Sequence, residues 1–204
     1  MLKNLIFDFD RTLVDTLDLA LQFGNSNQHR FSKKTISKEE FRRLSMREAL
    51  RKIGLPWYKL PRFLYELKGE LKNNIDKVQI FDGIFESVEF LYSKNTHLYI
   101  LSSNSASNVK LVLDKFKLGH CFKNIIGDSS LFGKHVVLKN FLKKENLNKN
   151  DCIYIGDEVR DIDACRKIGL PIVAVGWGWD DKERLQKTGQ AQIFSHPEEL
   201  KNLI

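Results

Sequence analysis

Two carboxylate side chains, Asp8 and Asp10, directly follow the apolar residues 5–7, where a buried strand would end. Two further carboxylates, Asp157 and Asp161, belong to the sequence GDEVRD, which directly follows the apolar run CIYI. Carboxylates can bind a hard divalent cation through oxygen, attack an electrophile or carry protons. A single pair of this kind is more often only the polar end of a strand, so a chemical role requires other functional groups nearby.

Two other polar groups occupy equivalent positions in the sequence. Ser102, Ser103 and Asn104 follow the apolar run LYIL, and Lys134 opens a helical stretch after NIIGDSSLFG. A hydroxyl and free backbone N–H groups at the start of a helix suit an anion such as phosphate, and a lysine supplies a compact positive charge. Carboxylates alone would repel a phosphate ester, but carboxylates that hold a divalent cation beside a lysine and an anion cradle suit phosphoryl chemistry.

The hydrophobic pattern shows which elements must position these groups. From residue 82 onward, apolar runs alternate with amphipathic stretches, which predicts a parallel sheet with helices on both faces. The first strand, residues 4–7, belongs to the same sheet. The predicted fold class is therefore α/β, with a Rossmann-like three-layer core. Ligands bind beyond the carboxyl ends of such strands, so we expect the four polar groups to meet in one crevice.

The segment between the first strand and the rest of the sheet has a different character. Almost every part of it reads as helical, and Ser37 and Ser45 each begin a capping box. We therefore expect a small α-helical cap, residues 15–81, inserted into a core formed by residues 1–14 and 82–204.

Composition narrows the class of protein further. The chain has 204 residues, of which 42% are hydrophobic, and a formal charge of +7. No basic run carries interleaved aromatic residues, so a nucleic-acid polymer is not an expected partner. Cys121, Cys152 and Cys165 form no C-x-x-C pair and are expected to be buried thiols in a reducing compartment. The longest apolar stretch is too short for a bilayer, which favours a cytoplasmic protein without membrane contact, either monomer or homodimer.

Several other residues are expected to have structural roles. His97, His120 and His135 show no ligand spacing with other metal-binding residues, so we expect them to be solvated or to cap helices. Trp177 and Trp179 could line a pocket, but a turn that packs against the core explains them at least as well.

The four polar groups together resemble the haloacid dehalogenase-like hydrolase superfamily, in particular its capped phosphatases of the phosphoglycolate phosphatase group. FDFDRTLVDT is similar to the D-x-D-x-T signature of that family, ILSSN to its strand ending in Ser or Thr, FGK to its lysine motif, and IGDEVRDIDACRKIGL to its G-D-x-x-x-D motif. The last of these is the most specific. Arg11 departs from the pattern, because most relatives carry glycine there, and this departure bears on substrate shape more than on chemistry.

The resemblance implies a role for each catalytic residue. Asp8 would attack phosphorus and form an aspartyl-phosphate, and Asp10 would protonate the leaving alcohol and then deprotonate the attacking water. The groups implied to hold the phosphate are Ser102, Ser103, Asn104 and Lys134.

The resemblance also implies a Mg²⁺ cofactor. Asp8 and Asp157 would supply carboxylate oxygens to the metal and Asp10 a backbone carbonyl, while Asp161 would support the metal waters or Lys134. We expect Thr12 to hold the turn through a bond from its side chain to the backbone.

The expected reaction is hydrolysis of a small phosphorylated metabolite, such as phosphoglycolate, a sugar phosphate or a nucleoside monophosphate. A phosphomutase on the same scaffold would share every residue named and differ only in the acceptor of the second step. A phospho-receiver or other regulatory protein without turnover is the alternative from another class; the length of the chain and the inserted cap argue against it. A dehalogenase would not need the acidic GDEVRD cluster, and no cap lysine has the context of a phosphonatase.

Overall fold

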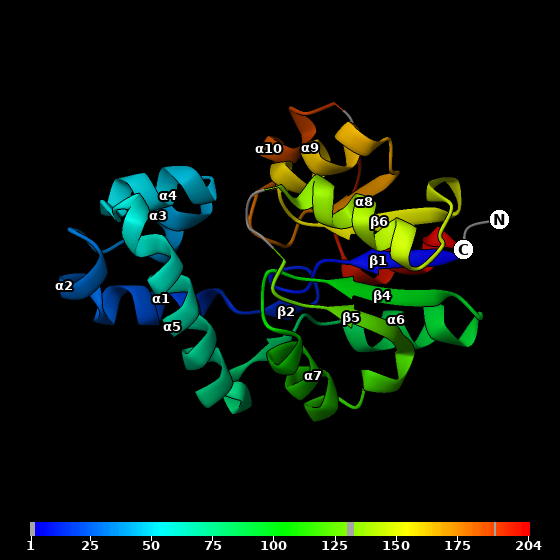
Figure 1. Ribbon diagram of the computed structural model, residues 1–204, viewed down its shortest axis with the longest axis horizontal. Helices are drawn as coiled ribbons and strands as arrows, with labels where there is room; N and C mark the ends of the chain where they lie inside the picture. Colours follow the sequence, from blue (N-terminus) through cyan, green and yellow to red (C-terminus); the bar gives the residue numbers. More distant parts are fainter. Residues whose placement is uncertain (1–2, 130–132, 190) are drawn as a thin grey trace.

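The computed structural model describes residues 3–129, 133–189 and 191–204, with the backbone alone for Met46 (Figure 1). Within these residues the chain forms a six-stranded sheet in the order β5-β4-β1-β6-β7-β8, and every neighbouring pair is parallel. The strands are β1 (Asn4–Phe7), β4 (His97–Leu101), β5 (Phe122–Ile126), β6 (Cys152–Gly156), β7 (Ile172–Val175) and β8 (Gln192–Phe194). Each strand coincides with a predicted apolar run, and the predicted α/β fold class is confirmed.

The strand order reverses around β1, which lies between β4 and β6. The chain runs outward from β1 through β4 to β5, and then returns to the other side of β1 to build β6, β7 and β8. The crevice of a doubly wound sheet lies beyond the carboxyl ends of the strands at such a reversal. Residues that follow β1, β4 and β6 therefore share one edge of the sheet.

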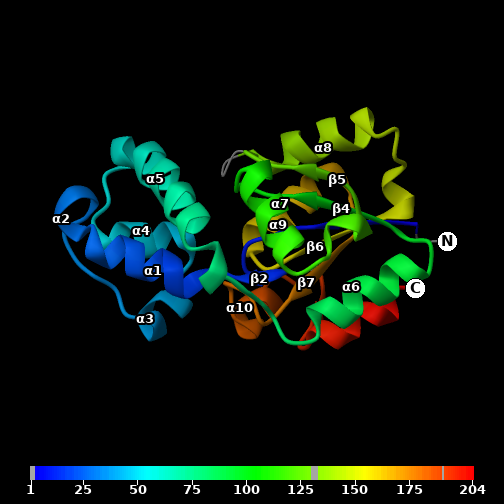
Figure 2. The ribbon, with the colours of Figure 1, turned by 90° about the horizontal axis from the view of Figure 1, so that it is seen from below.

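Helices cover both faces of the sheet (Figure 2). Leu5 and Phe7 of β1 belong to a different core cluster from Ile6, as expected when side chains alternate across a strand. The first cluster packs against α6 (Ile84–Ser93), α7 (Ala106–Lys115) and the 3₁₀ helix η5 (Pro197–Leu203). The second packs against α8 (Lys134–Lys144) and α9 (Val159–Ile168).

Shorter elements complete this part of the chain. The C-terminal stretch, which its amphipathic pattern predicts as helical, winds as the 3₁₀ helix η5, and Leu200 still packs into the core. The remaining elements are η3 (Gly119–Cys121), η4 (Lys149–Asp151) and α10 (Lys182–Gln186).

The segment between β1 and α6 is helical, as its sequence predicts, and lies to one side of the sheet (Figures 1 and 2). Its helices are α1 (Leu17–Ser26), α2 (Gln28–Phe31), α3 (Lys38–Arg42), α4 (Met46–Ile53), η1 (Trp57–Lys59), α5 (Leu60–Asn73) and η2 (Ile75–Lys77). They enclose a small core of their own around Phe23, Phe31, Leu55 and Phe63.

A two-stranded antiparallel ribbon joins the helical segment to the sheet. It pairs β2 (Val14–Asp15) with β3 (Gln79–Ile80), so the chain leaves and re-enters the segment at the same place. Hydrophobic periodicity cannot reveal strands of two residues, and the sequence did not predict this ribbon.

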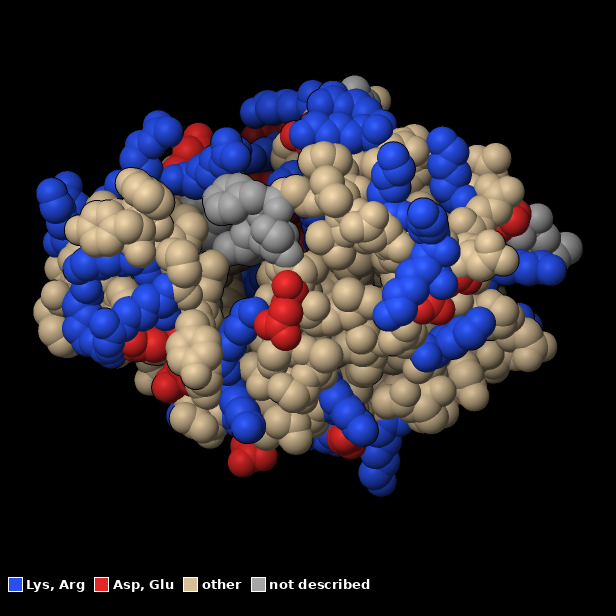
Figure 3. Space-filling model, in the orientation of Figure 1, with Lys and Arg blue, Asp and Glu red and all other residues tan. Residues whose placement is uncertain are grey.

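Lys and Arg side chains are spread over the face of the molecule seen in Figure 3, together with Asp and Glu side chains. Among the described residues, no helix is both long and apolar enough to cross a bilayer.

Candidate active site

The first strand delivers Asp8 to the crevice edge. All four residues of β1 are buried, and the backbone N–H of Asp8 continues the sheet pairing by donating to the carbonyl of Ile155, at 2.8 Å. The Asp8 side chain is buried as well, and its Oδ1 accepts a hydrogen bond from the backbone N–H of Phe9, at 2.8 Å. Sheet pairing and the turn that follows β1 therefore hold the Asp8 carboxylate at the end of the strand.

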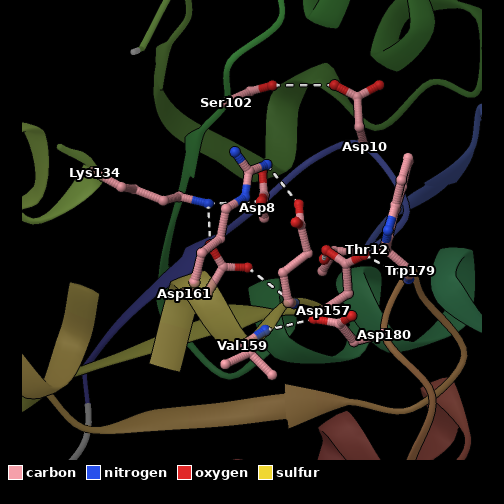
Figure 4. Close-up of polar contacts among 12 residues, drawn as sticks. Asp8, Asp10, Thr12, Ser102, Lys134, Asp157, Val159, Asp161, Trp179 and Asp180 are labelled. Atoms are coloured by element: carbon pink, nitrogen blue, oxygen red, sulfur yellow. Dashed lines mark hydrogen bonds and ion pairs between the residues drawn. The ribbon is translucent and has the colours of Figure 1, made fainter. Parts of the chain in front are cut away.

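Lys134 lies between two of the predicted carboxylates (Figure 4). Its Nζ donates to Oδ2 of Asp8 at 2.7 Å and to Oδ1 of Asp161 at 2.6 Å, and all three side chains are buried. Burial lowers the pKa of Lys134, but the Asp161 and Asp8 carboxylates reverse this and raise it above its ordinary value. The lysine is thus a fixed cation of the site. Phe132 of the FGK sequence lies outside the described residues.

Asp157 is fixed by the turn after β1 and by the loop after β7. Its Oδ1 accepts from the Thr12 hydroxyl at 3.0 Å, and its Oδ2 accepts from the backbone N–H of Trp179 at 2.7 Å. The expected role of Thr12 in holding its own turn is wrong, because its hydroxyl reaches across to this carboxylate. A Cβ at Gly178 would lie 2.1 Å from Cβ of Asp157, so only glycine permits this approach of the loop.

Asp10 points away from these carboxylates, toward the segment after β4 (Figure 4). It accepts hydrogen bonds from Thr16 Oγ1 at 3.2 Å, Asn104 Nδ2 at 3.4 Å and Ser102 Oγ at 3.5 Å. Burial and the nearby charge of Asp8 raise the pKa of Asp10 to about 6. A carboxyl group with such a pKa can both give and take a proton near neutrality.

The predicted phosphate cradle lies next to Asp10. Ser102 and Asn104 are buried, and the backbone N–H of Asn104 donates to Ser102 Oγ at 2.9 Å. Ser103 is partly exposed and lines the cleft described below. Ser105 caps α7 by accepting from the backbone N–H of Asn108, at 3.2 Å. The start of α7 therefore faces the end of β1.

The acidic cluster suits a divalent cation. Asp8, Asp157 and Asp161 each offer a carboxylate oxygen, and the three oxygens lie within 4.8 Å of one another. Burial and neighbouring negative charges raise the pKa of Asp157 well above its ordinary value. Lys134 balances one of the three negative charges, so the donor set and its excess charge match a hard cation bound through oxygen.

A cleft of about 830 Å³ lies between this cluster and the helical segment. Asp8, Asp10 and Arg160 line it on one side, and Leu64 of α5 and Leu17 of α1 line it on the other. The site is therefore open to a ligand on the side where the helical segment stands.

Contacts across the cleft join the helical segment to the rest of the chain. Nζ of Lys68 pairs with Asp128 at 2.7 Å, and the ring centroids of Phe41 and Trp179 lie 4.1 Å apart. Trp179 thus has the pocket-lining position that its sequence context left open. Trp177 instead packs against the core, and its Nε1 donates to the carbonyl of Thr12 at 3.0 Å.

The structure adds residues whose roles the sequence did not reveal. Arg160 pairs with Glu158 at 2.5 Å, and both line the cleft. Burial raises the pKa of Glu158 to about 7, while the charge of Arg160 opposes this shift. Asp180 accepts from the backbone N–H of Val159 at 2.8 Å and so caps α9. The only sign of these residues in the sequence was that Glu158 and Arg160 lie within GDEVRD and that Asp180 lies within GWGWDD.

Arg11 is buried, and it lies among the residues that line the cleft. Its backbone has φ +66°, a conformation that favours glycine, and its guanidinium pairs with Asp15. The same group donates to the carbonyls of Trp177 at 3.3 Å and Gly178 at 3.1 Å. Arg11 therefore ties the turn after β1 to the loop that positions Asp157.

Comparisons with known proteins agree with this geometry. The sequence model of the haloacid dehalogenase-like hydrolases matches residues 5–175. The chain is 30% identical over 202 residues to a phosphoglycolate phosphatase of Synechococcus elongatus, covering 98% of this chain and 95% of the relative. It is 25% identical to the pyrophosphatase PpaX of Listeria innocua, covering 90% and 88% of the two chains.

The fold is shared with solved structures. A predicted phosphatase from Clostridium acetobutylicum superposes with a TM-score of 0.83 at 21% identity, covering 99% of this chain and 97% of the other. The family model spans most of the chain, and the residues that carry the resemblance meet at one crevice. The chain belongs to the haloacid dehalogenase-like hydrolases and is a hydrolase with the fold of their phosphatases.

Proposed function

We propose that this hydrolase is a Mg²⁺-dependent phosphatase that hydrolyses a small phosphate monoester through an aspartyl-phosphate on Asp8. The observation that carries the proposal is the position of Asp8. Its carboxylate ends the central strand, pairs with Lys134 at 2.7 Å and lines the cleft beside Asp10. A nucleophile, a fixed cation and a second carboxyl group thus meet where a phosphoryl group can enter.

The proposed reaction has two steps. An oxygen of Asp8 bonds to phosphorus, the bond between phosphorus and the ester oxygen breaks, and Asp10 gives its proton to the leaving alcohol. Asp10 then takes a proton from water, whose oxygen bonds to phosphorus, and the bond to Asp8 breaks. The partly buried position of Asp10 and its pKa of about 6 support both duties. In this proposal the phosphoryl oxygens would face Ser102, Ser103, Asn104 and Lys134.

The proposed metal ligands are the carboxylates of Asp8 and Asp157 and the backbone carbonyl of Asp10. Mg²⁺ bound there would supply positive charge to the phosphoryl oxygens. Thr12 and Trp179 orient Asp157 through their hydrogen bonds, and Asp161 holds Lys134. Orientation of this kind matters because ligand geometry decides how well a metal site binds.

We also propose that the helical segment, residues 15–81, acts as a cap over a core of residues 1–14 and 82–204. Its separate aromatic core and its single ribbon of attachment support this division. Since the cleft lies between cap and core, cap residues would contact the leaving group and exclude water. The substrate is proposed to be a small phosphorylated metabolite of the cytoplasm, turned over by a monomer or homodimer.

The experiment is phosphate release from a substrate panel by purified protein in Mg²⁺. The panel contains phosphoglycolate and pyrophosphate, suggested by the names of two relatives, together with sugar phosphates and nucleoside monophosphates. We expect at least one ester to be hydrolysed, and Asp8→Asn to abolish the release. A sugar phosphate whose phosphate moves to another hydroxyl without release would instead indicate a phosphomutase. No turnover of any member would contradict the proposal.

A further inference from the structure

A second group of metal-binding side chains lies far from the cleft. Glu89 belongs to α6, and His120 and Cys121 belong to η3, which directly precedes β5. In a parallel sheet the start of a strand lies at the edge opposite its carboxyl end. The group is therefore on the opposite edge of the sheet from the proposed active site.

Three atoms of this group converge. His120 Nε2 lies 3.2 Å from Glu89 Oε1, and Cys121 Sγ lies 3.5 Å from each of these two atoms. From the sequence we expected His120 to be solvated or to cap a helix, because it shows no ligand spacing with other metal-binding residues. Its side chain is largely exposed, but it also lies beside Glu89, which is distant in the sequence. The fold supplies the ligand that the spacing lacked.

The triangle formed by these atoms has the size of one face of a zinc tetrahedron. With ordinary zinc bond lengths and tetrahedral angles, nitrogen and oxygen ligands lie about 3.4 Å apart and sulfur lies about 3.6 Å from either. The observed separations of 3.2, 3.5 and 3.5 Å agree with these edges to about 0.2 Å. One ion could therefore reach all three atoms with little movement.

We propose that Glu89, His120 and Cys121 form a second metal site, selective for a borderline divalent cation such as Zn²⁺. Thiolate and imidazole ligands favour such an ion over Mg²⁺, which prefers oxygen. Three protein ligands leave a fourth position for water or another ligand.

The surroundings suit entry and orientation of such an ion. The side chains of His120 and Glu89 are 54% and 36% exposed, so an ion can enter from solvent, whereas Cys121 is buried beneath them. The ring of Tyr92 meets the His120 ring edge to face at 5.3 Å and helps to fix its orientation.

Burial and the negative charge of Glu89 raise the pKa of Cys121 to about 12. The thiol is therefore protonated in the metal-free protein, and a bound ion must displace its proton. Metal binding would form the bond between sulfur and metal while the thiol proton leaves to solvent. The ion would then link α6 to η3 and stabilise the folded chain by binding only that state.

Cobalt gives a test with a readout that is independent of phosphatase activity. Co²⁺ is added to the reduced protein in excess Mg²⁺, and the near-ultraviolet absorption of a cobalt–thiolate bond is recorded. We expect the band in the wild-type protein, its displacement by Zn²⁺ and its loss in Cys121→Ser. Oxygen ligands of the acidic cluster cannot produce this band, so failure of the proposed phosphatase would not affect the result.

Matched variants make the test specific. Cys152→Ala and Cys165→Ala remove the other two thiols and should keep the band. Glu89→Gln and His120→Ala leave the buried thiol in place and should weaken Zn²⁺ binding at least about tenfold, measured by competition with a chromophoric chelator. Absence of the band in the wild type, its retention in Cys121→Ser, or unchanged affinity in both Glu89→Gln and His120→Ala would overturn the proposal.

Discussion

Nζ of Lys134 lies 2.7 Å from Oδ2 of Asp8, although 126 residues separate them in the sequence. Both side chains are buried, so the attraction between their charges is little screened by solvent. The pair places a permanent positive charge beside the carboxylate that we propose as the nucleophile.

Removing that charge should impair turnover severely. Lys134→Ala should lower kcat by about 10²-fold or more, because a preorganised electrostatic partner of the transferring group is lost. Lys139→Ala, on the exposed part of the same helix, should change kcat little. Steady-state kinetics at saturating Mg²⁺ compares the two variants, and equal small effects would place Lys134 outside the chemistry.

The metal should be required and should depend on Asp157. A chelator should abolish hydrolysis of an aryl phosphate, and added Mg²⁺ should restore it. Asp157→Asn should raise the Mg²⁺ concentration for half-maximal activity at least about tenfold, because a ligand charge is removed. The control is Asp163→Asn, a half-exposed carboxylate on α9 that pairs with Arg166. Full activity in excess chelator would contradict the metal assignment.

The contact between Phe41 and Trp179 should favour the arrangement in which the helical segment covers the cleft. An aromatic pair contributes about 0.5–1.5 kcal/mol, so Phe41→Ala should reduce kcat/KM between about twofold and tenfold. Phe85→Ala, which removes an exposed ring on α6, is the control and should have no such effect. An unchanged kcat/KM in Phe41→Ala would mean that this contact does not govern access.

Arg11 should stabilise the fold despite its left-handed backbone. Arg11→Ala should lower the free energy of unfolding by about 2 kcal/mol, because charged hydrogen bonds to partly buried partners are lost. Arg11→Gly loses the same bonds but relieves the positive φ, and it should be about 1 kcal/mol less destabilised than Arg11→Ala. Urea unfolding measures both variants. An Arg11→Ala protein as stable as wild type would show that these bonds contribute nothing.

Much of the site could be predicted because its residues follow apolar runs. The strands before Asp8, Ser102 and Asp157 have clear hydrophobic patterns, and parallel pairing then brings their carboxyl ends to one edge. Lys134 was predicted from its position at the start of the helix that follows β5. The structure brings Asp8, Asp161 and Lys134 into contact, as that reasoning expected.

Other features depend on contacts that no local pattern encodes. Thr12 was expected to bond within its own turn, but its hydroxyl reaches Asp157, 145 residues away. The packing of Phe41 on Trp179 depends on how the helical segment sits over the crevice. Glu89 meets His120 only because α6 passes beside η3. Each of these requires the tertiary arrangement, which hydrophobic periodicity does not supply.

The central claim is that Asp8 becomes phosphorylated while Asp10 carries protons. The most direct measurement is mass spectrometry of the intact protein, quenched after mixing with Mg²⁺ and an activated ester whose leaving group needs little protonation. Asp10→Asn should release a burst of alcohol and retain a covalent phosphoryl group, because it keeps the nucleophile but cannot activate water. Asp8→Asn should form no adduct. An adduct on Asp8→Asn, or full steady-state hydrolysis by Asp10→Asn, would contradict the account.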